Sequence, residues 1–329
     1  MKKNIALVTG GLSGEAVISY KSADSVLKNI DSEKYNCYLV DIRKDGWFCN
    51  IDKAEFPIDK NNFSVNKNGE VIIFDSALII LHGTPGEDGK IQGYFECIGM
   101  PYTSCDTATS AITFNKKNTI AIAAMAGINV AKSLQLFKND SYSENVVISS
   151  LKFPVFVKPN NGGSSLGISK VLGKETLNAA VAKAFKEDDQ IIIEEYIKGR
   201  ELTIGVFKKQ NEIIPLPATE ILSKNDFFDF EAKYNGASEE ITPAKIDNDV
   251  VEYLNNEAIK VYKLFNCRGV VRIDFILCEE NGKLYMLEIN TVPGQSAASI
   301  VPQQVLAMGL SLKEFYSSMI EESFNNGKK

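Results

Sequence analysis

The sequence predicts an α/β protein of several domains whose N-terminal part contains a parallel sheet. The chain has 329 residues, and at roughly 150 residues per domain this length suggests two domains or three smaller ones. Residues 4–8 form an apolar run that ends at glycines, residues 17–30 carry apolar side chains at helical spacing, and residues 36–42 form a second apolar run. A strand, a helix and another strand in this order indicate a right-handed crossover between parallel strands.

The later segments are predicted from the same periodicities. Up to residue 127 we expect a turn-rich stretch over 45–75 with a hairpin signal at Asn68-Gly69, a buried strand over 77–81, a helix over 90–98, a connection between domains over 101–109, and a helix over 111–126 capped by Gly127. The middle of the chain is expected to form strands over 155–158 and 168–171, a helix over 174–185, a strand over 190–196 and two strands over 201–216. The last part is expected to form a helix over 250–265, two strands joined at Asn281-Gly282, and two C-terminal helices. Residues 223–243 have no clear period, and a loop of that length predicts a functional lid.

The composition excludes several classes of protein. Hydrophobic residues make up 44% and charged residues 24% of the chain, as in an ordinary globular protein. Lys and Arg (36) against Asp and Glu (42) give a net charge of −6, which argues against a dedicated nucleic-acid binder. No run approaches the roughly 18 apolar residues of a membrane span, and the first apolar run is too short for a signal peptide. We therefore expect a cytoplasmic protein that binds neither nucleic acid nor a membrane.

The cysteines do not predict a metal cluster. The six cysteines contain no Cys-x-x-Cys pair, and the chain has one histidine to assist them. Free thiols buried in a reducing compartment are the expectation.

A glycine- and serine-rich loop at 162–167 is the most unusual segment of the chain. It follows the expected strand that ends at Lys158, and its backbone N–H groups and hydroxyls suit a phosphate. The alternative is a flexible hairpin tip, which the flanking strands and Lys158 disfavour. The chain lacks the P-loop motif, and Gly10, Gly11 and Gly14 lack the spacing of a dinucleotide fingerprint, so a nicotinamide enzyme is disfavoured.

Hard metal ligands stand on the two strands joined at Asn281-Gly282. Antiparallel pairing through that turn can bring Asp274 and Glu288 together, with Asn290 at the end of the second strand. Two carboxylates and an amide oxygen suit Mg²⁺ that bridges phosphates. The alternative is an ordinary ion pair between Asp274 and Arg272, which leaves the other two ligands unexplained. We favour the metal site.

Other candidates are weaker when each is taken alone. The turn at 291–294 can hold an oxyanion on backbone N–H groups, or it is a plain turn. Residues 192–197 form either a hinge for adenine or a solvated strand end, and the two alternatives are equally supported. Glu15 is most simply a first-turn acid. His82 stands at the carboxyl end of a strand, where open α/β sheets place ligands.

These segments together resemble the D-alanine–D-alanine ligase family of the ATP-grasp superfamily. The resemblance covers nearly the whole chain, and the motifs occur in the family's order. They are Gly10-Gly11-Leu12-Ser13-Gly14-Glu15, His82-Gly83 through Gly86-Glu87-Asp88-Gly89, Lys158-Pro159 with Gly163-Ser164-Ser165, Glu231-Ala232-Lys233-Tyr234, Arg272-Ile273-Asp274, and Glu288-Ile289-Asn290-Thr291 with Pro293-Gly294.

The resemblance implies a three-domain ATP-grasp fold with a Rossmann-like N-terminal domain. The expected ranges are a substrate-binding domain over 1–105, a central ATP-grasp subdomain with the phosphate loop over 106–195, and a C-terminal ATP-grasp domain with lid and metal site over 196–329. The implied activity is ATP-dependent ligation of two D-alanines through an acyl phosphate, with two Mg²⁺ or Mn²⁺ ions, for peptidoglycan precursors. A homodimer is implied as well.

Roles for single residues are implied by the same resemblance. Contacts to the nucleotide fall on Lys116, Lys158, Glu201 and Lys233, with Glu194, Glu195, Tyr196 and Ile197 as the adenine hinge and Phe227 packed on adenine. Metal ligands would be Asp274, Glu288 and Asn290. Substrates would be held by Glu15 (first ammonium group), His82 (orientation), and Ser299 and Ile300 (second carboxylate). Developing charge would be stabilised by Arg272 and the Gly294 N–H. A network linking the lid to the site would contain Glu15, Ser164 and Tyr234.

The chain departs from the family pattern at two positions. Ala298 stands where many relatives have His, which predicts a more open pocket for the second substrate. Gly162 stands where some relatives have an acid before the Gly-Ser-Ser segment. Alternatives are a D-alanine–D-lactate or D-alanine–D-serine ligase, another ATP-grasp carboxylate–amine ligase, and a nucleotide-binding protein without catalysis. Retention of the lysines, carboxylates and Arg272 disfavours the last.

Overall fold

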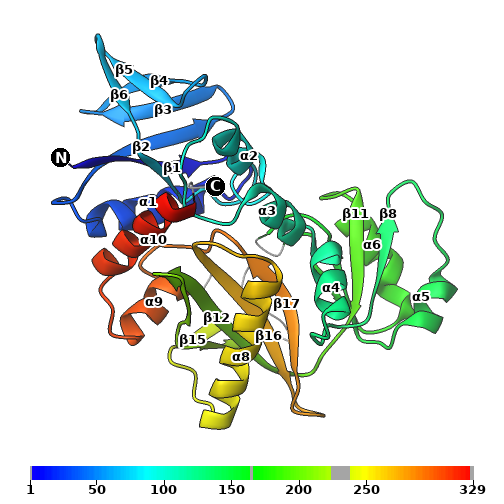
Figure 1. Ribbon diagram of the computed structural model, residues 1–329. Helices are drawn as coiled ribbons and strands as arrows, with labels where there is room; N and C mark the ends of the chain where they lie inside the picture. The colour runs from blue at the N-terminus through cyan, green and yellow to red at the C-terminus, as the bar shows by residue number, and fades with distance from the viewer. Residues whose placement is uncertain (1, 164–165, 224–237, 327–329) are drawn as a thin grey trace.

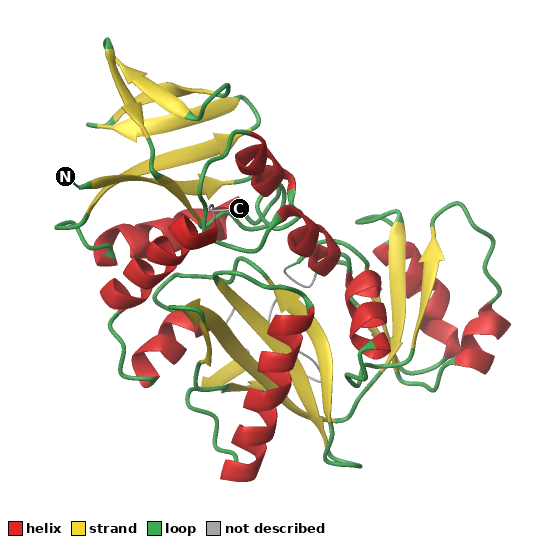
Figure 2. Cartoon of the chain, viewed as in Figure 1, coloured by secondary structure: helices red, strands yellow, loops and turns green. Residues whose placement is uncertain are grey.

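The described strands form three separate sheets, which lie at three corners of the molecule (Figure 1). The computed structural model describes residues 2–163, 166–223 and 238–326. Helices flank all three sheets, as Figure 2 shows, and the α/β class that the sequence predicts is confirmed. In the described ranges, no helix is both long enough and apolar enough to cross a bilayer.

The first sheet has seven strands in the order β6-β5-β4-β3-β2-β1-β7. Their bounds are Lys3–Gly10 (β1), Tyr35–Arg43 (β2), Gly46–Ile51 (β3), Ala54–Asp59 (β4), Ser64–Lys67 (β5), Glu70–Ile73 (β6) and Ser76–Ile79 (β7). Strand β1 pairs in parallel with β2 and β7, and helix α1 (Ala16–Asn29) makes the crossover, as predicted. The rest of the sheet is antiparallel, and its last hairpin turns at Asn68-Gly69, where both residues have positive φ. The sheet is therefore only partly parallel.

The second sheet is antiparallel, with the order β10-β9-β11-β8. Its strands are β8 (Ser133–Phe137), β9 (Val155–Pro159), β10 (Ser169–Val171) and β11 (Gln190–Glu195), and its helices are α5 (Glu144–Ser150) and α6 (Leu177–Ala184), the latter preceded by the 3₁₀ turn η1 (Lys174–Thr176). Val155 and Val157 alternate on β9 with partly exposed residues, and both pack with Leu177 in one core. The strands β9, β10 and β11 were predicted, whereas β8 and α5 were not.

The third sheet follows the order β15-β14-β12-β16-β17, with β13 paired to β12. Its strands are β12 (Gly199–Lys209), β13 (Glu212–Pro215), β14 (Thr219–Ser223), β15 (Ser238–Ile241), β16 (Val270–Cys278) and β17 (Leu284–Asn290). The predicted hairpin of β16 and β17 is present, and Gly282 in its turn has φ +66°. Helix α8 (Asn248–Leu264) covers the sheet through buried residues such as Leu254 and Val261.

Two expectations about secondary structure need correction. The single helix expected over 111–126 is two helices, α3 (Thr107–Phe114) and α4 (Lys116–Met125). They separate at Asn115, whose backbone is extended and whose side chain caps α4 by accepting a hydrogen bond from the Asn118 N–H. The stretch expected to lack structure over 223–243 is shorter, because β14 ends at Ser223 and β15 begins at Ser238. Residues 224–237 lie outside the described chain.

The C-terminal helices join the third sheet to the first. Helix α9 (Ile300–Ala307) leads to α10 (Leu312–Asn326), which lies beside α1 and contacts β7 and β12 (Figure 1). Helix α2 (Lys90–Cys97) packs on the other side of the first sheet. One core contains Leu7 of β1, Phe207 of β12 and Phe315 of α10. The rings of Phe207 and Phe315 meet edge to face, with centroids 5.3 Å apart. The first and third sheets therefore share a hydrophobic core.

We predict that Phe315→Ala lowers the free energy of unfolding by about 3–5 kcal/mol, because the ring is fully buried between two sheets. Urea unfolding followed by circular dichroism measures the loss. Met125→Ala is the matched control, since that side chain is 90% exposed and its loss is expected to cost about 0.5 kcal/mol or less. A Phe315→Ala variant as stable as the control would contradict the shared core.

Candidate active site

A cavity of about 1140 Å³ is lined by residues of all three sheets. The predicted site residues that the structure describes all line it. They are Glu15, His82, Lys116, Lys158, Glu194, Glu195, Tyr196, Ile197, Glu201, Arg272, Asp274, Glu288, Asn290, Gly294, Ser299 and Ile300. The other predicted residues, Ser164, Phe227, Lys233 and Tyr234, lie outside the described residues.

The hairpin of β16 and β17 presents one polar face to this cavity. Successive side chains of a strand point to opposite faces, so Arg272 and Asp274 share a face while Ile273 is fully buried in the core behind them. The register places Asp274 opposite Glu288 and Arg272 opposite Asn290. Four polar side chains therefore meet on one face, as the turn at Asn281-Gly282 predicts.

Arg272 and Asp274 form a two-pronged ion pair. Arg272 Nε and Nη2 each donate to one Asp274 oxygen at 2.9 Å, and the Thr203 hydroxyl donates to Asp274 Oδ1. Burial disfavours the charge of Arg272, yet the carboxylates of Asp274, Glu288 and Glu87 outweigh burial and raise its pKa. The ion pair that the sequence offered as an alternative is thus present. Among the described residues, no group of three or more His, Cys, Asp or Glu side chains is arranged to hold a metal ion.

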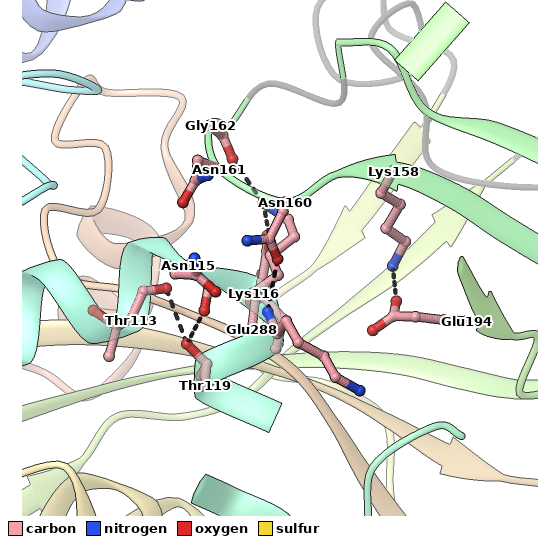
Figure 3. A network of polar contacts seen from close by, with 12 residues as sticks. Thr113, Asn115, Lys116, Thr119, Lys158, Asn160, Asn161, Gly162, Glu194 and Glu288 are labelled. Atoms are coloured by element: carbon pink, nitrogen blue, oxygen red, sulfur yellow. Dashed lines mark hydrogen bonds and ion pairs between the residues drawn. The ribbon is translucent and has the colours of Figure 1, made fainter. Parts of the chain in front are cut away.

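Lys158 of β9 pairs with Glu194 of the neighbouring strand β11 (Figure 3). Lys158 Nζ lies 2.7 Å from Glu194 Oε2, because Lys158 and Ile192 are register partners and Glu194 is two residues further along the same strand. Burial opposes the charge of Lys158, but Glu194, Glu288 and Glu201 raise its pKa, so the ammonium group stays charged. The Glu194 carboxylate is therefore engaged by a lysine at the cavity wall.

The residues after Glu194 line the same wall. The Glu195 carboxylate accepts a hydrogen bond from the Lys152 N–H at 2.9 Å. This bond anchors the end of β11 to the segment between α5 and β9. The ring of Tyr196 lies 5.9 Å from that of Phe156, centroid to centroid. Phe156 was not predicted, although its position two residues before Lys158 on β9 was a signal that both share a face.

Lys116 ties the glycine-rich loop to the start of helix α4 (Figure 3). Its Nζ donates to the Gly162 carbonyl at 2.7 Å, and its backbone N–H donates to the Asn160 carbonyl at 3.0 Å. Lys116 Nζ also lies 3.8 Å from Glu288 Oε2 of β17. The break at Asn115 is what allows this, since it starts a new helix with Lys116 beside the loop.

The Glu15 carboxylate lies between two glycines, Gly83 and Gly163, from distant parts of the chain. A Cβ added to Gly163 would lie 2.6 Å from Glu15 Oε1, and one added to Gly83 would lie 2.6 Å from Glu15 Oε2. Gly83 also has φ +66°, which favours glycine. The backbone of Gly83 thus favours glycine, whereas a methyl group at position 163 would have to push the Glu15 carboxylate aside.

His82 is buried and neutral. Its backbone N–H donates to Ser19 Oγ at 2.9 Å, and its Nε2 lies 3.3 Å from Ser22 Oγ. Burial and, after it, the charge of Arg272 lower the pKa of His82 to about 4, against a hydrogen bond with the Val292 backbone. A neutral imidazole supplies no positive charge near pH 7.

Glu87 is a cavity residue that the sequence did not single out. It accepts a hydrogen bond from the Gly83 N–H at 2.8 Å and is buried. Burial and, after it, the charge of Glu15 raise the pKa of Glu87 to about 8, although the hydrogen bond from Gly83 and the charge of Arg272 oppose them. The Gly86-Glu87-Asp88-Gly89 motif was a signal that could have found it.

The segment that leads into α9 is tightly folded. Ser296 Oγ and Ser299 Oγ lie 2.8 Å apart, and a Cβ on Gly294 would lie 2.7 Å from Ser299 Oγ. Ala298 lines the cavity, and its carbonyl accepts a hydrogen bond from Gln303 at 3.1 Å. Gln303 also donates to Glu240 Oε2 at 3.3 Å, which places a second unpredicted acid at this wall.

Two family models match the chain. The model described as D-ala D-ala ligase N-terminus matches residues 4–105, and the model described as D-ala D-ala ligase C-terminus matches residues 122–321. A D-alanine--D-alanine ligase of Parabacteroides distasonis is 45% identical over 100% of this chain and 99% of its own length. The protein of that name from Flavobacterium johnsoniae is 45% identical over 98% of this chain and 99% of its own length.

Solved structures agree with these matches. The VanG D-Ala:D-Ser ligase from Enterococcus faecalis superposes with a TM-score of 0.88 at 30% identity, covering 99% of this chain and 100% of that chain. The D-alanine--D-alanine ligase from Bacillus anthracis complexed with ATP superposes with a TM-score of 0.80 at 27% identity, covering 99% of both chains. The full-length identities and the two family models, which together span most of the chain, show that it belongs to the D-alanine–D-alanine ligase family.

Proposed function

We propose that this protein joins two molecules of D-alanine at the expense of ATP, through an acyl phosphate. The observation that carries the proposal is one cavity, lined by residues of three sheets, that collects Lys116, Lys158, Arg272 and several carboxylates. Cations suit the phosphates of a nucleotide, and carboxylates suit an ammonium group and metal ions. The family relationship gives this arrangement its substrates, D-alanine and ATP.

The nucleotide fits the side of the cavity between the second and third sheets. Lys158 and Lys116 offer ammonium groups there, and the loop at 162–163 offers backbone N–H groups. Apolar side chains beside them suit a base, among them Phe156, Ile276 and Leu287. Residues 194–197 would form the adenine hinge, with Glu201 nearby. Lys233 and Phe227 are proposed to contact the nucleotide from the lid on the strength of the sequence alone.

The donors on the third sheet suit divalent cations that bridge phosphates. Glu288 and Asn290 offer a carboxylate and an amide oxygen, and Asp274 keeps lone pairs beyond those that Arg272 and Thr203 occupy. These three residues would hold two Mg²⁺ or Mn²⁺ ions. Such ions would neutralise the charge that develops on the oxygens of the transferred phosphoryl group.

The chemistry then needs two displacements. A carboxylate oxygen of the first D-alanine attacks the γ-phosphorus, and ADP leaves. The amine of the second D-alanine, having lost a proton, attacks the acyl carbon, and inorganic phosphate leaves as the C–O bond breaks. Glu15 would hold the first ammonium group, and His82 would help to orient the substrate. Arg272 and the Gly294 N–H would stabilise the tetrahedral oxyanion.

The second substrate fits the end of the cavity at α9. Ser299 and Ile300 would hold its carboxylate, and Ala298 leaves room beside it. The proposal has three further parts. The first is a network of Glu15, Ser164 and Tyr234 that links the lid to the site, and the second is a homodimer. The third is a division into domains over 1–105, 106–195 and 196–329. The VanG ligase is named for D-serine, so a second substrate other than D-alanine is the second candidate.

We predict that phosphate release from ATP and Mg²⁺ requires D-alanine and is absent with L-alanine. With the ammonium group held at Glu15 and a carboxylate oxygen against phosphorus, the methyl group of L-alanine would point where D-alanine has its hydrogen, and we expect the cavity wall to exclude it there. Arms with D-alanine plus D-serine or D-lactate, analysed by mass spectrometry, distinguish the second candidate. No release with D-alanine alone would contradict the proposed activity.

We predict that Glu288→Gln lowers turnover by at least about tenfold at limiting Mg²⁺. We expect its melting temperature to equal that of the control variant. The amide keeps the shape of the side chain but removes the charge that would hold the cation. The control is Glu279→Gln, whose carboxylate pairs with the exposed Lys198 at 2.9 Å. Turnover equal to that of the control would rule out Glu288 as a metal ligand.

We predict that Gly163→Ala lowers kcat by about 10- to 100-fold without unfolding the protein. The new methyl group would displace the Glu15 carboxylate, which is the movable end of a side chain, and so disturb the ammonium site rather than the core. Gly93→Ala in α2 is the control, because its Cβ would meet Thr107 at 3.4 Å. If both variants turned over like the unmodified protein, the contact between Gly163 and Glu15 would have no catalytic role.

A further inference from the structure

The turn before α9 is held from inside the protein by one buried side chain, Gln295. It is 1% exposed, and its side-chain amide and its backbone N–H all find partners. Its Nε2 donates to the Pro293 carbonyl at 3.0 Å, which closes the turn on itself. Its Oε1 accepts from the Tyr316 hydroxyl of α10 at 3.3 Å, and its N–H donates to Ser22 Oγ of α1 at 3.1 Å.

Ser22 connects this turn to His82. Ser22 is fully buried, and its oxygen accepts the Gln295 N–H, so its own hydrogen is available for His82 Nε2 at 3.3 Å. That direction agrees with a neutral His82, because an imidazole without charge has one nitrogen that accepts. The chain of bonds Gln295 to Ser22 to His82 therefore has one consistent set of proton positions.

Gly294 lies between Pro293 and Gln295, which are joined by the hydrogen bond described above, and it lines the cavity. Within the described part of the chain, no group accepts a hydrogen bond from the Gly294 N–H, whereas the N–H groups of Gln295 and Ser296 are both used by serines. A donor that is held still and left without a protein partner is suited to an oxyanion, since it needs no reorganisation during the reaction.

We propose that Gln295 is a positioning residue for the Gly294 N–H, and that Ser22 and Tyr316 hold Gln295 in place. This inference rests on the proposed function, because it gives the Gly294 N–H a reaction to serve. Through Ser22 the same bonds keep His82 and the turn in a fixed relation, so that the residue proposed to orient the first substrate and the donor for the oxyanion move together. The elements that supply these anchors, α1 and α10, pack against each other in the shared core.

The test uses the full chain with Ser22→Ala, Tyr316→Phe and Gln295→Met. Each removes hydrogen bonds to the turn while keeping most of the buried volume. We expect kcat for phosphate release with D-alanine to fall by about tenfold in each, since small misplacements at a reacting centre are costly. We expect the KM for ATP to stay unchanged. Ser323→Ala is the control, because Ser323 is also a fully buried serine, bonded to Ser76 Oγ at 2.7 Å and to the Ile320 carbonyl at 2.6 Å.

Amide hydrogen exchange over residues 290–299, measured without ligands, gives a readout that does not depend on catalysis. Faster exchange there in Ser22→Ala than in Ser323→Ala, together with the lower kcat, supports the proposal. Faster exchange with kcat unchanged would overturn it, as would a kcat and an exchange rate equal to the control. If the unmodified protein released no phosphate, the proposed function would fail, while exchange would still show whether Gln295 fixes the turn.

Discussion

A buried guanidinium group at the meeting of the three sheets governs the arrangement of the site. Arg272 is charged and removed from water, so its folded position depends on carboxylates within reach. Asp274 accepts two hydrogen bonds of 2.9 Å from it, and Glu288 adds to the negative field. Removal of Asp274 would deprive the buried guanidinium of both of these hydrogen bonds. Together with burial, the same positive charge lowers the pKa of His82, so the Arg272 guanidinium affects both the acidic and the neutral groups around it.

The fold supplies that charge with its partners through simple rules of strand geometry. Alternation on β16 and β17 turns Arg272, Asp274 and Glu288 toward the cavity while Ile273 enters the core. The shared core around Phe315 then fixes the first sheet against the third, which brings Glu15 and His82 to the same cavity. Precise placement of groups from separate sheets is what a reaction with two displacements requires.

Sequence reasoning succeeded where local pattern decides structure. The crossover through α1, the Asn281-Gly282 hairpin and the strand ending at Lys158 all follow from periodicity and turn residues. It failed where distant contacts decide: Asn115, which separates two helices, forms a β-bridge with Asn161, and β8 pairs with β11. Among the site residues, Gln295 and Phe156 belong to no chemical motif, and their roles depend on neighbours that only the folded chain brings near.

The central claim is that this cavity lets a D-alanine carboxylate attack ATP. D-alanine labelled with ¹⁸O in its carboxyl group tests this directly, because the oxygen that joins phosphorus stays on the phosphate when the C–O bond breaks. The account predicts inorganic phosphate that carries one ¹⁸O atom per turnover, measured by mass spectrometry in unlabelled water. Phosphate without ¹⁸O, formed together with the dipeptide, would show that the carboxylate never joins the γ-phosphorus and would contradict the account.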